Sequence, residues 1–197
     1  MSTEAGKQGN GTRIRQQKLS FYHPNAAGNG VALQCEPRVN RCETDRYNCF
    51  FFEMAAQKTL SSREGDKRVM PTFDWANKLT VKLDFADICE MLLVFEGRQE
   101  RVGGQKNGIY HDSDRANTVI SFGKVPDKGG FSFGLSRKEK DSGQLTRLQI
   151  LLSEAEAMGL KTIIQTGLFF VTFHAHLFER ENSESRSQNS ESRIQEA

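Results

Sequence analysis

Aromatic and basic residues are interleaved along the apolar stretches of this sequence. The rings are Tyr22, Phe51, Trp75 and Tyr110, and the cations are Lys58, Lys78, Lys82, Arg137, Lys138, Lys140 and Arg147. Lysines and arginines neutralise successive phosphates of a nucleic-acid strand, while rings stack on its exposed bases. This combination favours a single-stranded nucleic acid as the ligand. The structural alternative is that the rings fill a core and the cations form an ordinary solvated face.

Catalytic and metal-binding interpretations have less support. His111-Asp112 could be a base with an orienting acid, and His174-x-His176 could supply two metal ligands on one strand face. No third ligand or nucleophile stands at a recognisable spacing from either pair. The phosphate-binding motifs G-x-x-x-x-G-K-[ST] and G-x-G-x-x-G do not occur. The sequence therefore predicts a protein that is not an enzyme, with no catalytic residues, no cofactor and no metal.

Length and charge limit the class of protein. The chain has 197 residues and a formal net charge of +2, which fits one domain of ordinary size. Because the basic excess is small, any nucleic-acid footprint must be local. The cysteines lack zinc-ribbon spacing and are too scattered for a disulfide scaffold, so we expect reduced thiols; they are Cys35, Cys42, Cys49 and Cys89.

The two ends of the chain differ from its middle. Residues 1–17 and 179–197 are too polar to offset chain entropy, so we expect disordered tails around one domain at 18–178. No apolar run reaches the roughly 18 residues that span a bilayer, and the start lacks the apolar segment of a signal peptide. We expect a cytoplasmic or nucleoid-associated protein with no membrane partner. Its Arg-containing start leaves organelle import open.

Inside the domain, short segments recur in the same order, which indicates two diverged copies of one unit. The matches are Phe21-Tyr22-His23 with Ile109-Tyr110-His111, Asn29 with Asn117, Val31 with Val119, Phe50-Phe51-Phe52-Glu53-Met54 with Phe131-Ser132-Phe133-Gly134-Leu135, and Leu79-Thr80 with Leu145-Thr146. The offset shrinks along the chain, which places an insertion in the first copy, in a polar loop at 61–68. We expect repeats at about 18–100 and 105–178.

Each copy has the pattern of strands followed by one helix. In the first, Leu79, Val81, Leu83 and Phe85 alternate with polar residues, as in a half-buried strand, and put Lys78 and Lys82 on one outward face. A helical density of apolar residues follows at 87–95 and ends at Gly97, a plausible C-cap.

The second copy repeats this order. Strand residues up to Leu152 lead into Ser153-Glu154-Ala155-Glu156, a capping box. Gly167 and the β-prone residues after it leave the end of this helix open. By strand alternation, an outward row of small residues ends in a charge: Ser132, Gly134, Ser136 and Lys138. The predicted class is α+β, with mostly antiparallel sheets that are each followed by a helix. Both helices are more apolar than one covered sheet requires, which favours burial between subunits.

Three segments resemble the Whirly family of single-stranded DNA-binding proteins, whose fold also occurs in guide-RNA-binding proteins of trypanosome mitochondria. They lie within residues 20–173 and are Cys35-Glu36-Pro37-Arg38, Phe73-Asp74-Trp75-Ala76-Asn77-Lys78 and Ile109-Tyr110-His111-Asp112. The resemblance implies two ββββα repeats and a homotetramer with the helices at its centre. It also implies single-stranded DNA lying over sheet edges between subunits, with little sequence preference, and adds Arg38 to the candidate contacts.

One segment departs from the family pattern. The Whirly signature Lys-Gly-Lys-Ala-Ala-Leu would fall on Gly28-Asn29-Gly30-Val31-Ala32-Leu33, so glycine replaces both lysines. The departure bears on higher-order assembly and on part of the affinity that the motif is associated with in the family.

The leading hypothesis is a non-catalytic protein that binds single-stranded DNA and protects or organises it in repair, replication or transcription. The first alternative keeps the fold and changes the ligand to RNA, as a binding or annealing factor, since discrimination depends on contacts to the 2′-hydroxyl. The second alternative is an oligomeric protein scaffold without nucleic-acid affinity.

Overall fold

The computed structural model describes residues 18–38, 48–125, 127 and 129–173. The predicted tails at 1–17 and 179–197, Cys42 and the His174-x-His176 pair lie outside these residues. Within the described part of the chain, no helix is both long and apolar enough to cross a membrane. Cys35 and Cys89 carry free thiols, as predicted, and burial raises the pKa of both.

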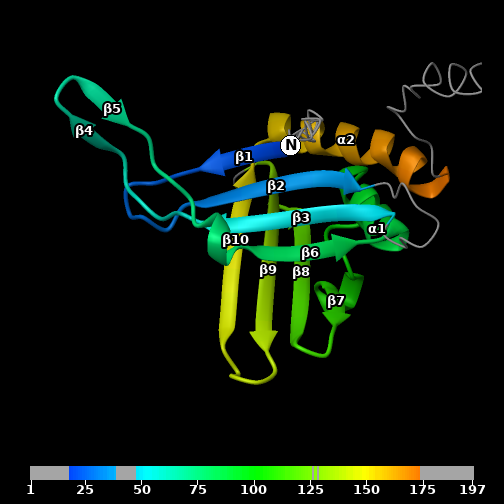
Figure 1. Cartoon of the computed structure of the whole chain (residues 1–197). Helices are drawn as coiled ribbons and strands as arrows, with labels where there is room; N and C mark the ends of the chain where they lie inside the picture. The colour runs from blue at the N-terminus through cyan, green and yellow to red at the C-terminus, as the bar shows by residue number, and fades with distance from the viewer. Residues whose placement is uncertain (1–17, 39–47, 126, 128, 174–197) are drawn as a thin grey trace, which may run out of the picture.

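Two four-stranded antiparallel sheets, each followed by a helix, form the body of the protein (Figure 1). Sheet 1 has the order β1-β2-β3-β6 and leads into α1; its elements are β1 (Leu19–His23), β2 (Val31–Arg38), β3 (Cys49–Ala56), β6 (Leu79–Leu83) and α1 (Phe85–Phe95). Sheet 2 has the order β10-β9-β8-β7 and leads into α2; its elements are β7 (Ile109–Asp112), β8 (Ala116–Lys124), β9 (Phe131–Glu139), β10 (Leu145–Leu152) and α2 (Glu154–Phe173). The predicted α+β class with two ββββα repeats is confirmed.

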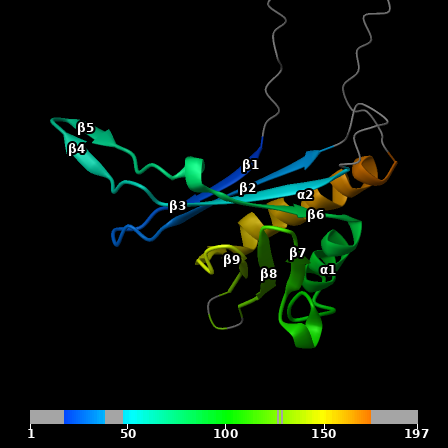
Figure 2. The same cartoon turned by 60° about the horizontal axis from the view of Figure 1, so that its bottom comes forward.

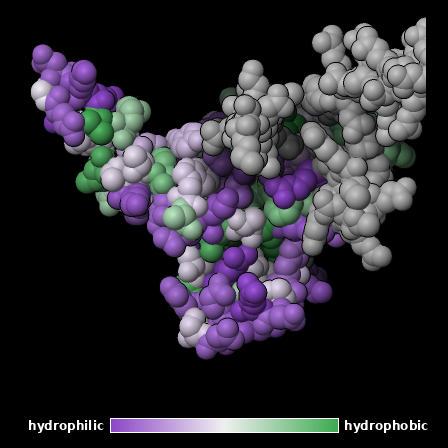
Figure 3. All heavy atoms as spheres, viewed as in Figure 1, coloured by the Kyte–Doolittle hydropathy of each residue, from purple (hydrophilic) through white to green (hydrophobic). Residues whose placement is uncertain are grey.

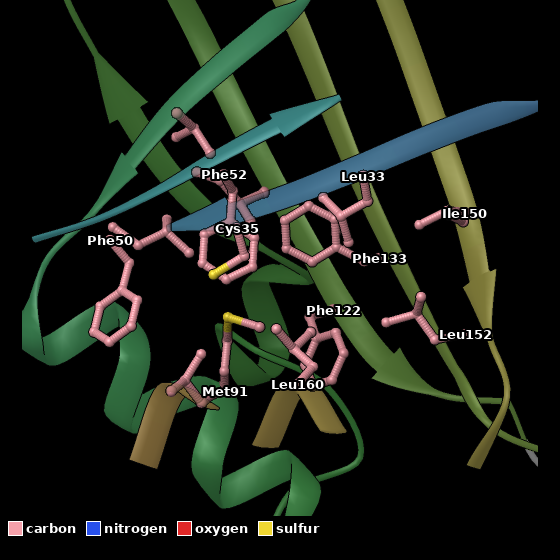
Figure 4. Packing of buried hydrophobic residues seen from close by; sticks show 14 of the residues in the cluster. Leu33, Cys35, Phe50, Phe52, Met91, Phe122, Phe133, Ile150, Leu152 and Leu160 are labelled. Atoms are coloured by element: carbon pink, nitrogen blue, oxygen red, sulfur yellow. The ribbon is translucent and has the colours of Figure 1, made fainter. Parts of the chain in front are cut away.

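The core lies between the inner faces of the two sheets, whose strands cross in Figure 1. Alternation along β3 and β9 sends Phe50, Phe52, Phe131 and Phe133 inward, where all four are buried. Phe52 and Phe133 occupy equivalent positions in the two repeats and stack at 5.2 Å between ring centroids (Figure 4). The core interpretation is therefore right for these phenylalanines.

Both helices begin at a capping box, which is the reason they begin where they do. Ser153 and Glu156 bond reciprocally at the start of α2, as predicted. The start of α1 was predicted two residues too late, and Phe85 is exposed rather than part of the strand, because Asp84 caps the helix together with Asp87. Gly97 ends α1 at a φ of 71°, as expected for a C-cap glycine.

Helix α2 continues through Gly167 as far as Phe173. A Cβ at position 167 would lie 2.6 Å from Cζ of Phe50, so the glycine lets the helix approach sheet 1 closely. The β-prone residues after Gly167 stay helical because tertiary packing against sheet 1 overrides their local preference.

Strand register corrects three of the internal matches. Phe21 pairs with Leu33 and Ile109 with Ile120, so the match of Val31 with Val119 is wrong by one residue, as is that of Asn29 with Asn117. A one-residue difference in loop length causes this error and exchanges the two faces of a strand. The equivalent of Leu79 is Leu148 rather than Leu145, because β10 starts earlier than β6. The match between β3 and β9 is correct.

The insertion lies between β3 and β6, as predicted, but it forms a hairpin rather than a loop. Its strands are β4 (Ser62–Glu64) and β5 (Lys67–Val69), joined at Gly65-Asp66 with Gly65 at a φ of 60°. A glycine with positive φ at the first turn position suits a two-residue hairpin. The hairpin projects beyond the end of sheet 1 in both views (Figures 1 and 2). The described residues also include two short 3-10 helices: η1 (Trp75–Asn77) and η2 (Gly104–Lys106).

Candidate nucleic-acid interface

The outer face of sheet 1, which points away from sheet 2, carries a group of three rings that we call the ring cluster: Tyr22, Phe73 and Trp75. The Tyr22 ring lies 5.6 Å from that of Phe73 and 6.4 Å from that of Trp75, centroid to centroid. Ala32 and Ala55, beside Tyr22 in register, are fully buried, so small side chains form the floor beneath the rings. Tyr22 remains half exposed, at 51%.

The segment that returns from the hairpin to β6 positions the other two rings. Phe73 bridges to Gln57, and the Asp74 amide donates to the Ala56 carbonyl at 2.8 Å. Asn77 then donates to the Asp74 carboxylate at 2.8 Å, which lowers the pKa of Asp74. These bonds fix η1 at the end of β3 and hold the Trp75 ring edge-on to Tyr22. The exposed Lys58 lies in the same region, since its charge also acts on Asp74.

Next to the ring cluster, two lysines share one carboxylate. Lys18 Nζ lies 2.7 Å from Oε2 of Glu53, and Lys78 Nζ lies 2.5 Å from Oε1. Burial acts to raise the pKa of Glu53, but bonds to both lysines outweigh it and the pKa lies below its usual value. Lys78 therefore faces outward, as predicted, but with part of its charge compensated.

The far end of the same face combines a ring with cations. The Arg38 guanidinium lies 4.6 Å above the centroid of the Phe51 ring, a cation–π arrangement, and Lys82 is beside Phe51 in register. Arg38 also contacts the carboxylate of Glu36 at 3.1 Å. Phe51 is thus half-buried on the outer face, unlike its neighbours Phe50 and Phe52.

The outer face of sheet 2 carries smaller side chains along its middle than the outer face of sheet 1 does. Ser132, Gly134, Ser136 and Lys138 form the predicted outward row, and the pleat places Arg147 next to Ser136 on the β10 side. Tyr110 lies on this face at the edge strand β7 and is 63% exposed. Lys140 is bound to Asp112, Nζ to Oδ1, at 2.7 Å.

Arg137 was predicted to contact nucleic acid, which requires a side chain on the outer face of sheet 2. The structure places it on the inner face instead. Strand alternation turns it to the inner side of β9, where it is half-buried. Its guanidinium donates to Oγ1 of Thr118 at 3.3 Å and to the carbonyl of Thr80 on the edge of sheet 1. Arg137 therefore joins the two sheets instead of facing solvent with Lys138.

The His111-Asp112 pair, which the sequence analysis considered as a catalytic base with its acid and set aside, is not formed. His111 and Asp112 point to opposite faces of β7, and Asp112 binds Lys140 while His111 Nε2 lies 3.0 Å from the Asp87 carboxylate. In the first repeat, His23 lies 2.7 Å from Glu156 at the start of α2, so each repeat's histidine contacts the other repeat's helix. Among the described residues, no three His, Cys, Asp or Glu side chains form a group that could hold a metal ion.

Sequence reasoning missed Lys18, Glu53 and Phe73 as members of this surface. Phe73 belongs to the segment that resembles the Whirly family and is two residues from Trp75. That proximity could have placed it in the same ring cluster. Lys18 adjoined the predicted tail, and only strand register brings it to Glu53, 35 positions along the chain.

The turn before β2 explains the missing lysines. Gly28 has a φ of 75°, and a Cβ at Gly30 would lie 2.4 Å from the His23 carbonyl oxygen and from Oε1 of Gln57. That Oε1 accepts bonds from the amides of Asn25 and Gly30. The turn is closed by Gln57 and leaves no room for a side chain at position 30.

Solved structures share this arrangement of sheets and helices. The chain is similar to WHY3 from Arabidopsis thaliana, with 18% identity, a TM-score of 0.61, and coverage of 82% of this chain and 92% of that one. The plant transcriptional regulator PBF-2 gives 18% identity, a TM-score of 0.62, and coverage of 82% and 93%. This chain has the Whirly fold. A guide-RNA-binding protein complex, solved bound to a guide RNA, has the same fold at 18% identity, a TM-score of 0.55, and coverage of 83% and 97%. No family model matches the sequence, and no curated protein matches it significantly.

Proposed function

We propose that this protein is a non-catalytic binder of single-stranded nucleic acid, with single-stranded DNA as its ligand and little sequence preference. The observation that carries the proposal is the half-exposed ring cluster over a floor of alanines, flanked by Lys18, Lys58 and Lys78. Stacking on rings accepts any base, and lysines next to them track the phosphates. The Whirly fold supports the proposal, since PBF-2 and the guide-RNA-binding complex share it.

Apart from Arg137, the candidate contacts fall into three groups on this basis. Tyr22, Trp75, Lys58 and Lys78 belong to the ring-cluster end of sheet 1, and Arg38, Phe51 and Lys82 to its far end. Tyr110, Lys138, Lys140 and Arg147 lie on sheet 2 and would meet a strand that continues over the molecule. Arg137 is left out of the binding set, because it points to the inner side of β9 and its Nε and Nη2 donate to Thr118 and Thr80. In the cell, such a protein would protect or organise single strands during repair, replication or transcription.

A homotetramer is part of the same proposal. The helix that follows sheet 2 exposes large apolar side chains along its length, and Phe85 at the start of α1 adds to them; those on α2 are Met158, Ile163, Phe169 and Phe173. Exposed apolar residues in this number mark a contact surface. Light scattering should give four times the chain mass, and Phe169→Ser/Phe173→Ser should lower it. A monomeric wild-type protein would contradict this part.

The test of ligand class is a fluorescence-anisotropy titration of a mixed-sequence single-stranded 30-mer against its duplex, at low and moderate salt. We expect a strong preference for the single strand, weakened by salt and by Lys78→Ala/Lys82→Ala. An RNA 30-mer of the same sequence separates DNA from RNA as the preferred ligand. Equal affinity for duplex and single strand would contradict the proposal. Binding to neither strand would contradict it as well and would favour the scaffold alternative.

A further inference from the structure

The β4–β5 hairpin, which we call the arm (residues 61–70), has no equivalent in the second repeat. In that repeat, β9 and β10 are joined by a short turn through Asp141, Ser142 and Gly143. The arm is exposed along almost its whole length and projects past the end of sheet 1 (Figure 2). A two-stranded ribbon is only marginally stable by itself, and this one leaves most of its surface open to a ligand.

The two faces of the arm pair their charges differently: opposite charges face each other on one, and like charges on the other. On one face, Glu64 stands directly opposite Lys67. On the other face, Arg63 stands directly opposite Arg68, and like charges in that position repel. Within the described part of the chain neither arginine has a salt bridge. An anion placed between the two guanidinium groups would relieve this repulsion.

The space between the two arginines is hollowed. Its lining is formed by Ser61, Ser62, Arg63 and Arg68. The two guanidinium groups are hydrogen-bond donors, and a planar guanidinium matches the oxygens of a phosphate. Ser62 pairs with Val69, so strand alternation turns its side chain to the face opposite the arginines. The tip of the arm is hydrophilic, whereas apolar side chains occur near its base, where Leu60 and Met70 are exposed (Figure 3). The two guanidinium groups suit an anionic group with paired oxygens, and the strand that we propose to bind at the ring cluster supplies such groups as phosphates.

The arm is also firmly attached to the ring cluster. The Lys58 amide donates to the Thr72 carbonyl at 2.7 Å, and the Thr72 amide donates to Oγ1 of Thr59 at 2.9 Å. Phe73 of the ring cluster follows Thr72 directly. From Phe73 to Arg68 the extended chain covers roughly 16 Å, at about 3.3 Å for each residue. A strand of nucleic acid that stacks on the ring cluster is therefore within a few nucleotides of the arginine pair.

We infer that the arm is a phosphate clamp, in which Arg63 and Arg68 hold the phosphodiester backbone of the strand bound at the ring cluster. This inference rests on the proposed function and assigns a role to the insertion. The clamp lengthens the footprint, so it acts on long strands and not on strands that only cover the ring cluster.

The test compares fluorescein-labelled dT30 and dT6 by anisotropy at several salt concentrations. Arg63→Ser/Arg68→Ser should weaken binding of dT30 by on the order of tenfold at 0.1 M salt and lower the salt slope by about 1.4, the value for two lost phosphate contacts. Affinity for dT6 should fall less than affinity for dT30, because a strand of that length reaches both the ring cluster and the arm in only some of its positions. Glu64→Gln/Asp66→Asn, which alters charge on the same arm, and Arg98→Ser/Lys124→Ser, which removes two exposed cations elsewhere, should leave the dT30 salt slope near the wild-type value.

Three outcomes would overturn the inference. If the wild-type protein binds dT30 but the arginine variant keeps its affinity and salt slope, the clamp is wrong while the proposed function stands. If the variant changes the oligomeric mass measured by light scattering, the arm is a subunit contact. If the wild-type protein binds neither oligonucleotide, the proposed function fails and the clamp with it.

Discussion

Tyr22 and Tyr110 occupy equivalent places on the first strand of the two repeats, and their surroundings differ. Tyr22 packs beside Phe73 and Trp75, and Glu53 on the same face holds two lysines. On sheet 2, Gly134 stands at the position equivalent to Glu53, and among the described residues no ring packs against Tyr110. Phe73 and Trp75 come from the segment that only the first repeat has. Duplication explains the fold, and the insertion next to β3 explains the candidate interface.

The inner faces should behave alike where the outer faces differ. Phe52→Ala and Phe133→Ala each remove a fully buried ring from the same stacked pair, so each should lower the free energy of unfolding by about 3–5 kcal/mol. Urea denaturation followed by circular dichroism measures both. A loss below about 1 kcal/mol for one variant alone would contradict the equivalence of the two repeats in the core.

The outer faces should diverge when one ring is removed from each. Trp75→Ala should weaken single-strand binding by about 1–3 kcal/mol, roughly 5- to 150-fold, because it removes a base-stacking surface. Tyr110→Ala is the matched control and should weaken binding much less. Anisotropy with the 30-mer measures both variants. Equal losses would mean that the two faces bind alike and that the insertion is not what distinguishes them.

Glu53→Gln removes the carboxylate of sheet 1 whose equivalent position in sheet 2 is Gly134. Its carboxylate offsets charge on Lys18 and Lys78, so the variant should bind the single strand roughly two- to fivefold more tightly at low salt. The same change loses charged hydrogen bonds at a buried position and should lower stability by about 1–2 kcal/mol. Because folding lowers the pKa of Glu53, the stability difference should shrink as the pH falls through that pKa. Weaker binding by the variant would contradict this account.

The smallest expected effect is on the pH dependence of stability at the two helix starts, where His23 contacts Glu156 and His111 contacts Asp87. Burial acts to raise the pKa of Glu156, but bonds from His23 and Ser153 lower it overall, so its stabilising contribution exists above the ordinary pKa and is lost on acidification. Burial raises the pKa of Asp87, so its charged form opposes folding and this cost disappears as the pH falls.

Stability measured at pH 7 and pH 4 should therefore change in opposite directions for these equivalent carboxylates. The wild-type advantage over Glu156→Gln should decrease at pH 4, and that over Asp87→Asn should increase, each by no more than about 1 kcal/mol. Denaturant titrations at the two pH values measure both. Parallel changes would show that the two helix starts are electrostatically alike.

The sequence predicted the elements of the fold better than their register. Alternation in 79–83, the capping box at Ser153 and the glycine at 97 are local signals, and each led to the right element. Register depends on loop length and on pairing across the sheet, so the matches of Val31 and Leu79 were wrong by one and three positions. The helical role of Gly167 depends on Phe50, which no local pattern connects to it.

The candidate interface was predictable only in part. Tyr22, Trp75 and Lys78 were selected by residue type, and the structure brings them to one end of one sheet face. Residue type could not show that Arg137 points inward, since an arginine in a strand can lie on either face of the sheet. The arginine pair of the arm could not be predicted either, because only the register of the hairpin places Arg63 opposite Arg68.

Trp75 is the only tryptophan in the chain, and this makes the central claim directly measurable. Titration of the wild-type protein with an unlabelled single-stranded 30-mer should quench its tryptophan emission, and the quenching should saturate at the concentration at which anisotropy of the labelled strand saturates. Stacking of a base on the ring cluster accounts for both signals. Binding by anisotropy with unchanged tryptophan emission would contradict the account, because the strand would then lie away from the outer face of sheet 1.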